Sequence, residues 1–263
     1  MAKSSEASTL HQLQTGFLEQ NRNDLWWVRP VIEASILTAL LIYSLWAVLF
    51  GYEHSSAPDL HPYLSPLFVP DFEPSWWSPR LPPGLLAIWI PVGLRATCYY
   101  SRRVYYRAFF ADPPACAVGE TPLSTNRYKG ETSLPWILNN IHRYFVFLAF
   151  IVAFFHFWVL LNSFVYNGKF YIGVGNLIVF SAVFFLTFYI LSCHATRHFV
   201  GGCLNCFSCS TSTRTRFKLW KGISWMNKKH GQDFWLSLIL ITVADIYIRL
   251  VSMGIITDPH LGG

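Results

Sequence analysis

Charged residues are scarce in this chain of 263 residues, where Asp, Glu, Lys and Arg together make up 13%. A soluble globular domain carries about twice that fraction, so this class of protein is excluded. Apolar residues make up 53% of the chain and occur in long runs, which is typical of membrane-spanning segments. Residues 1–24 lack an apolar core, so we expect no cleaved export signal.

Acidic residues are also few, and the formal net charge is +6. Eight of the 20 bases lie in two segments beside apolar runs, 111–134 and 201–230, whereas the segments 52–82 and 166–170 together hold two. This distribution follows the positive-inside rule of membrane proteins and argues against nucleic-acid binding. We therefore expect a cytoplasmic N-terminal segment over residues 1–28 and a basic cytoplasmic loop over 201–230.

Five apolar segments predict an all-α integral membrane domain over residues 29–256, with five transmembrane helices in a bundle. The expected helices lie at about 30–50, 83–107, 135–165, 171–200 and 233–254. The segment 52–82, rich in Pro and Trp, is expected to lie on the outer membrane surface. The turn Asn167-Gly168-Lys169 is expected to join the third helix to the fourth.

Four of the six cysteines and two of the nine histidines fall within residues 192–209. His194 and His198 are four residues apart, so on a helix both imidazoles could reach one metal ion. Cys203, Cys206 and Cys209 follow with the C-x-x-C spacing of thiolate ligands. Two nitrogens and two sulfurs fit either a zinc ion or a two-iron cluster whose irons have different ligands.

Which two of the three cysteines bind the metal remains open, and Cys193 is a weaker candidate because it points about 100° away from its neighbour on a helix. A structural zinc site, buried free thiols and a thiol–disulfide pair formed by Cys203 and Cys206 are the alternatives. His142 is expected at the depth of the His pair, on the order of 9 Å from the inner end, as a third nitrogen donor or a quinone partner. His156 is interpreted as a packing residue, with haem ligation as the alternative.

The inner end of the second apolar segment mixes Tyr, Arg and Ser. Ser101, Arg102 and Tyr105 could donate to a quinone carbonyl at the border between apolar and polar surroundings. Asp245 and Arg249 form an ionisable pair inside the fifth segment, four residues apart. The pair is expected to be either a proton relay or an internal ion pair that stabilises packing.

Three motifs are similar to those of one protein family. They are the run from Arg95 to Phe109, the turn Pro113-Pro114-Ala115-Cys116, and Cys193-His194-x-x-Arg197-His198-x-x-Gly201-Gly202. The chain resembles the single-chain, five-helix membrane anchor of bacterial succinate dehydrogenases, particularly the mycobacterial type. The similarity extends from Leu25 to Met253, nearly the whole chain.

The resemblance implies a bacterial cytoplasmic-membrane complex with a flavoprotein subunit and an iron–sulfur subunit, which passes electrons from succinate to menaquinone or ubiquinone. It also implies a haem-free anchor with a Rieske-type 2Fe–2S cluster on His194, His198 and two nearby cysteines. The Cys-x-His and Cys-x-x-His pairs of soluble Rieske proteins are absent from the sequence. A haem b anchor and a zinc-stabilised assembly protein remain the alternatives, and higher oligomers of the complex are left open.

Overall fold

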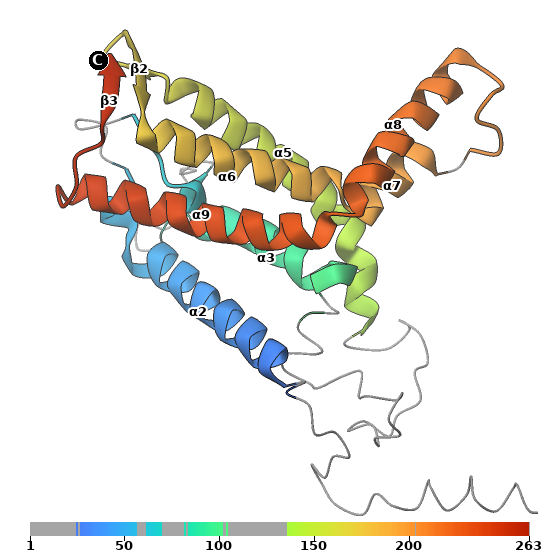
Figure 1. The fold of residues 1–263 in the computed structure, drawn as a ribbon, viewed down its shortest axis with the longest axis horizontal. Coiled ribbons are helices and arrows are strands. Elements are labelled where there is room, and N and C mark those ends of the chain that lie inside the picture. Colours follow the sequence, from blue (N-terminus) through green and yellow to red (C-terminus); the bar gives the residue numbers. More distant parts are fainter. Residues whose placement is uncertain are drawn as a thin grey trace, which may run out of the picture.

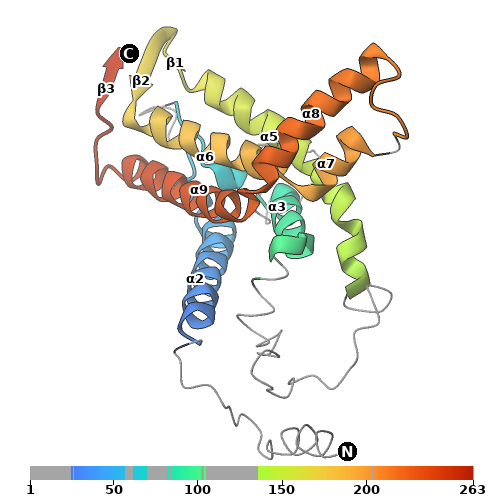
Figure 2. The same ribbon diagram turned by 45° about the vertical axis from the view of Figure 1, so that its right-hand side comes forward.

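The computed structural model describes residues 25, 27–56, 62–69, 82, 84–101, 104, 136–202 and 204–262. Five helices form a bundle: α2 (Val28–Phe50), α3 (Leu85–Thr97), α5 (His142–Asn162), α6 (Val174–Leu191) and α9 (His230–Ser252). Two further helices, α7 (His194–Gly201) and α8 (Thr211–Asn227), form a hairpin that projects beyond one end of the bundle (Figures 1 and 2). The mostly helical architecture confirms the predicted all-α membrane class.

Four helices are long and apolar enough to cross a bilayer, namely α2, α5, α6 and α9. Helix α3 has 13 residues. At 1.5 Å per residue it extends about 20 Å, less than the roughly 30 Å of a bilayer core. Within the described residues the structure therefore supports four full spans and not five. The cytoplasmic position of the N-terminus remains a prediction, because residues 1–24 lie outside the described part.

Two helices that the sequence predicts as continuous are broken in the structure. Helix α3 ends before Cys98, which has an extended backbone with φ −66° and ψ 133°. Helix α6 ends at Leu191, and Cys193 precedes α7 with φ −65° and ψ 144°. Both breaks occur at a cysteine, and both lie at the end of the bundle from which α7 and α8 project. We call this the basic end.

The opposite end carries a small antiparallel sheet that the sequence did not predict. We call it the hairpin end after its β-hairpin; the α7–α8 hairpin lies at the other end, the basic end. Strands β1 (Val165–Tyr166) and β2 (Lys169–Gly173) are joined through Asn167 (φ 49°) and Gly168 (φ 74°), the positive-φ pair of a type I′ turn. This is the expected connection between the third and fourth apolar segments. Strand β3 (His260–Gly262) pairs with the other edge of β2, which gives the order β1-β2-β3.

Between α2 and α3, the described residues 62–69 pack among the helices of the bundle. The segment that joins α2 to α3 includes two short 3₁₀ helices, η1 (Tyr52–His54) and η2 (Pro66–Phe68). Phe68 is 1% exposed and lies beside Gly84, at the start of α3. Within residues 62–69 the loop is therefore packed into the bundle, which corrects the expectation of a surface loop for this described part.

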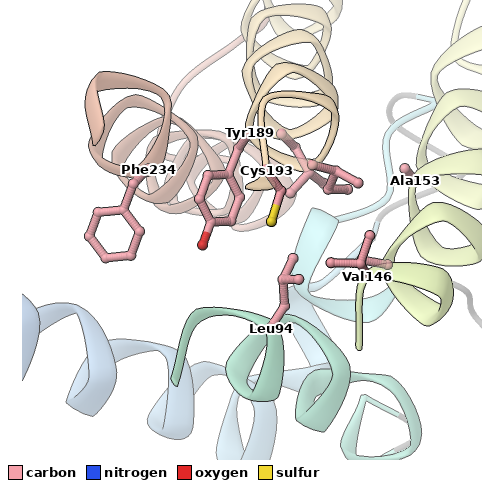
Figure 3. Packing of buried hydrophobic residues seen from close by; sticks show 9 residues of the cluster. Leu94, Val146, Ala153, Tyr189, Cys193 and Phe234 are labelled. Carbon is pink, nitrogen blue, oxygen red and sulfur yellow. The ribbon is translucent and has the colours of Figure 1, made fainter. Parts of the chain in front are cut away.

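Two clusters of buried side chains hold the bundle together. The cluster nearer the basic end includes Leu94, Val146, Tyr189 and Phe234 from four different helices (Figure 3). The cluster nearer the hairpin end joins α6 and α9 to the loop residue Tyr63. Because each cluster draws on elements far apart in sequence, burial of apolar surface fixes the arrangement of the helix ends.

At the hairpin end, one buried carboxylate joins the loop, strand β2, helix α6 and helix α9. Asp258 accepts hydrogen bonds from the hydroxyls of Tyr63 (2.6 Å), Tyr171 (2.7 Å) and Tyr247 (2.6 Å), and from the backbone N–H of Gly175 (3.0 Å). Burial raises the pKa of Asp258, but these four donors outweigh it and hold the pKa below its ordinary value. Burial and the bond to Asp258 raise the pKa of Tyr171 to about 12, so this hydroxyl remains a donor at physiological pH.

We predict that Asp258→Asn destabilises the hairpin end by about 1–3 kcal/mol, because charge-assisted bonds are lost in a buried site. A lowered folded-state pKa means that the carboxylate contributes its stability above its unfolded pKa of about 4, and loses it as the pH falls through the folded value. The thermal unfolding midpoint of the wild type should therefore converge on that of Asp258→Asn in acid. Glu53→Gln makes the same carboxylate-to-amide change at an exposed position and should leave the unfolding midpoint unchanged at neutral pH. If Glu53→Gln lowers the midpoint as much as Asp258→Asn does, the role of Asp258 is refuted.

Candidate functional site

Four side chains with metal-binding chemistry lie together at the basic end. The Sγ of Cys98 lies 3.3 Å from Nε2 of His230, and the Sγ of Cys193 lies 3.0 Å from Nε2 of His142. Cys98, Cys193 and His230 are buried, and the two thiols are within interaction range of each other. We call these four residues the donor cluster.

Each member of the donor cluster stands at the end of a helix. His142 is the first residue of α5, directly after the 3₁₀ helix η4 (Trp136–Ile141), and His230 is the first residue of α9. The two cysteines occupy the extended positions that follow α3 and α6. In Figure 3 the sulfur of Cys193 and the hydroxyl of Tyr189 both point toward α3. The four helix ends therefore direct sulfur and nitrogen into one space.

The hydrogen bonds of His142 assign its tautomer. Thr97 donates its hydroxyl proton to the carbonyl of Gly93 at 2.7 Å, so it must accept from Nδ1 of His142 at 2.9 Å. Nδ1 therefore carries a proton, and Nε2 is directed at the sulfur of Cys193. A histidine whose other ring nitrogen is fixed in this way is typical of metal ligands.

His230 is held in the same way by a different residue. Ser192 donates to the carbonyl of Tyr189 at 3.2 Å and accepts from Nδ1 of His230 at 2.8 Å. Nε2 of the same ring therefore faces the sulfur of Cys98. The ring of Tyr189 stacks on the His230 imidazole with centroids 4.8 Å apart and planes 13° apart, which fixes the ring orientation. Both histidines thus show the outer-sphere support that is typical of metal ligands.

The donors do not converge on a single point. Among the residues that the structure describes, no three His, Cys, Asp or Glu side chains are arranged to hold one metal ion. The described contacts are two sulfur–nitrogen pairs, Cys98 with His230 and Cys193 with His142, and the two thiols also lie within interaction range of each other.

The predicted metal ligands lie elsewhere, on the α7–α8 hairpin. His194 and His198 are on α7, and both are exposed. Cys206 and Cys209 form a disulfide with each other, and Cys203 lies outside the described residues. Cys193, the weaker candidate, belongs to the donor cluster instead. Metal binding by the α7–α8 residues remains a prediction.

Hydrogen bonds and a cation–π contact join the two helices of the α7–α8 hairpin. Arg216 donates to the carbonyls of Val200 (2.8 Å) and Gly202 (3.2 Å), at the end of α7. The guanidinium of Arg197 lies 4.7 Å from the centroid of the Trp220 ring. These contacts join α7 to α8 directly, so the fold of the hairpin is accounted for by its own residues.

The predicted quinone residues are partly described. Ser101 is 3% exposed, and its hydroxyl has no hydrogen-bond partner among the described residues. His142, expected at this depth, belongs to the donor cluster. Arg102 and Tyr105 lie outside the described residues. His156 is buried with both nitrogens facing carbonyls, of Val152 at 2.8 Å and Pro66 at 3.0 Å, which agrees with a packing role.

Asp245 and Arg249 form a buried ion pair with Nε and Oδ2 2.8 Å apart. Asp245 also accepts from the hydroxyls of Tyr43 and Ser65, and Arg249 donates to the carbonyls of Gly51 and Ala47. The network joins α2, the η2 loop and α9. Both carboxylate oxygens of Asp245 and all three guanidinium nitrogens of Arg249 have hydrogen-bond partners, which favours a packing role. The proton relay stays a prediction.

Two members of the donor cluster, Cys98 and His230, were missed by sequence reasoning. Both lie at the end of an apolar segment beside basic residues, at the depth that pointed to His142. Applying the same depth argument to every segment would have found them. The clustering of cysteines along the chain drew attention to α7–α8 instead.

Comparison with known proteins gives two matches. Residues 28–254 match the family model described as actinobacterial succinate dehydrogenase subunit SdhC. A chain in a solved structure of the Mycobacterium smegmatis Sdh1 complex in the apo form is 31% identical, with a TM-score of 0.79 over 94% of this chain and 96% of that chain. No curated protein matches.

We predict that Asp245→Asn lowers stability by about 3–5 kcal/mol, because it leaves the buried Arg249 without its countercharge. Glu33→Gln is the matched control, since Glu33 pairs with an Arg29 side chain that is 80% exposed and should contribute under about 1 kcal/mol. Thermal unfolding and quinone-reduction rates of the two variants would be compared with wild type. Slow turnover of Asp245→Asn at wild-type stability would instead support the proton relay.

Proposed function

The chain belongs to the actinobacterial succinate dehydrogenase SdhC family, and from this we propose that it relays electrons from a cytoplasmic iron–sulfur subunit to quinone through a 2Fe–2S centre within its helix bundle. The chain is a multi-pass membrane-anchor subunit of succinate dehydrogenase and associates with other subunits of that enzyme. In this proposal the flavin and the succinate chemistry belong to a partner subunit.

The donor cluster is the observation that carries the proposal. Two thiols and two imidazoles match the mixed ligand set of a Rieske-type centre, in which histidines replace two of the four cysteines. In both imidazoles Nδ1 faces a hydroxyl and Nε2 faces a sulfur. We therefore assign the centre to Cys98, His142, Cys193 and His230.

A centre bound there would take up and release one electron at a time, at a potential that imidazole ligation raises. The protein holds the site through Thr97 and Ser192, whose hydroxyls fix the two imidazoles. Tyr189 and Phe234, 1% and 2% exposed, exclude water from this side. Burial and fixed hydrogen bonds are the means by which the protein would tune the potential.

The predicted ligand set on α7–α8 is the rival assignment. Its histidines are exposed, and Cys206 and Cys209 are joined to each other, which leaves fewer donors free. In the donor cluster, by contrast, Cys98, Cys193 and His230 are buried, and both imidazoles are oriented by hydrogen bonds. We therefore favour the donor cluster, with the α7–α8 residues in a structural role.

We place the basic end on the cytoplasmic side of the bacterial plasma membrane. From Cys193 to Gln232 the sequence contains no acidic residue, and the exposed face of α8 carries Arg214, Lys218 and Lys221. The positive-inside rule favours this orientation. It also puts the donor cluster at the side from which the soluble subunits deliver electrons.

We predict that Cys193→Ser or His230→Gln removes the iron and acid-labile sulfide of one 2Fe–2S centre, because the centre loses a ligand. The measurements are metal and sulfide content of the purified complex and its electron paramagnetic resonance spectrum after reduction. His194→Gln and His198→Gln, in the rival set, should leave both unchanged.

The opposite outcome, loss of the signal only with His194→Gln or His198→Gln, would transfer the centre to α7–α8. A Soret absorption band lost on substitution of His142 would establish a haem b anchor instead. Zinc without iron or sulfide would establish a structural metal site.

We also predict that Thr97→Val lowers occupancy of the centre about 10–100-fold, because His142 loses the hydroxyl that fixes its tautomer. Thr97→Ser restores the hydroxyl and should restore occupancy and the resonance spectrum. If Thr97→Val retains the wild-type spectrum and potential, Thr97 only packs and does not position His142.

A further inference from the structure

The hydroxyl of Tyr189 is buried beside the donor cluster and lacks an acceptor. Tyr189 is 1% exposed, and its hydroxyl has no hydrogen-bond partner among the described residues. In Figure 3 this hydroxyl and the sulfur of Cys193 both point toward α3, and the hydroxyl lies within interaction range of the thiol of Cys98, which follows α3. Native proteins seldom bury a donor without a use for it. The O–H of Tyr189 is therefore available to a sulfur acceptor.

Three side chains fix the ring that carries this hydroxyl. The His230 imidazole stacks on the ring with centroids 4.8 Å apart, and Phe234 meets it edge-on with centroids 5.9 Å apart. The guanidinium of Arg95 lies 5.2 Å from the ring centroid, in the range of a cation–π contact. Because these neighbours hold the ring, the packing of the bundle sets the direction of the C–O bond of Tyr189.

Arg95 is a cation without a countercharge. Its Nη2 donates to Ser237 at 3.1 Å, whereas its buried Nε has no partner within the described residues. No carboxylate of the described part of the chain forms an ion pair with it. Arginine keeps its charge inside proteins, and a partly buried cation is costly unless a negative charge lies nearby. The site next to Arg95 therefore suits a group that becomes anionic.

Reduction of the proposed 2Fe–2S centre supplies such a negative charge. Two ferric ions, two bridging sulfides and two thiolates carry no net charge, and neutral imidazole ligands add none. One electron from the partner iron–sulfur subunit converts one ferric ion to ferrous, with no bond or proton changed, and leaves one negative charge. Arg95 lies three residues before Cys98, about one helical turn, and within electrostatic range of its thiol. The cation therefore attracts the reduced centre more strongly than the oxidised one.

We propose that Tyr189 and Arg95 set the reduction potential of the centre, the hydroxyl by donating to the Cys98 sulfur and the guanidinium by balancing the charge that reduction adds. The inference rests on the proposed function and assigns two potential-setting residues to it. Hydrogen bonds to the sulfurs and net charge are two of the factors that control the potentials of iron–sulfur centres. Both contacts stabilise the reduced form, so both raise the potential.

The first test removes the hydroxyl and keeps the ring. Tyr189→Phe in the purified complex should lower the midpoint potential about tenfold in the one-electron equilibrium constant, or about 59 mV, with iron and sulfide content unchanged. The measurement is a redox titration followed by electron paramagnetic resonance, in which the g-values of the reduced centre should also shift. Tyr144→Phe, a hydroxyl loss at a position that is 63% exposed and two residues after His142, should change neither. A wild-type potential in Tyr189→Phe would overturn the role of the hydroxyl.

The second test removes the charge. Arg95→Gln should lower the potential by a similar amount, Arg95→Lys should retain most of it, and the difference should persist in high salt because a buried charge is screened little. If Arg95→Gln fails to retain iron, Arg95→Met removes the charge and keeps the apolar stem. Arg143→Gln is the matched control, because Arg143 adjoins His142 in the chain but is exposed. An iron-loaded Arg95 variant without the charge and with the wild-type potential would overturn the role of the guanidinium.

Failure of the proposed function gives a different result. If the wild-type complex holds no centre that depends on Cys193 and His230, the ligand assignment is wrong and the inference is wrong with it. If the centre depends on both residues but its potential is the same in wild type, Tyr189→Phe and Arg95→Gln, the ligand assignment stands and the inference alone is wrong.

Discussion

Two hydrogen bonds, from the Nδ1 atoms of His142 and His230 to the hydroxyls of Thr97 and Ser192, set the geometry on which the basic end depends. They join α5 to α3 and α9 to the end of α6. Each bond also turns Nε2 of the same ring toward a cysteine sulfur. The same contacts therefore fix the packing of four helix ends and the chemistry available between them.

Much of the fold could be predicted from hydropathy, because long apolar runs in a membrane leave few alternatives to helices. The breaks at Cys98 and Cys193 could not, since each lies within a helical pattern and depends on contacts with other helices. His142 was expected inside the third helix at the depth of His194; it is the first residue of α5, directly after the 3₁₀ helix η4. The partners of His142 were missed because they are far apart in the sequence and meet only at the ends of different helices. The C-x-x-C spacing identifies only cysteines that are close along the chain.

Buried polar groups in this protein fall into two kinds. Those around Asp245 and Asp258 are fully hydrogen-bonded, and they connect the loop and the C-terminal strand to the helices. By contrast, four buried atoms have no hydrogen-bond partner among the described residues: Arg95 Nε, Ser101 Oγ, the Tyr189 hydroxyl and Asp233 Oδ2. Complete networks specify a shape, and the unpartnered atoms lie near the basic end. The hairpin end is thus built for rigidity and the basic end for chemistry.

The carboxylate of Asp258 comes later in the chain than all three tyrosines that bind it. During synthesis on the ribosome, Tyr171 and Tyr247 lack this acceptor until residue 258 has been made, whereas Tyr63 also lies 3.1 Å from Oδ1 of Asn176. The hairpin end therefore closes last, after every helix of the bundle has been made. A chain that ends before residue 258 would lack the acceptor that joins the loop, strand β2 and helix α9.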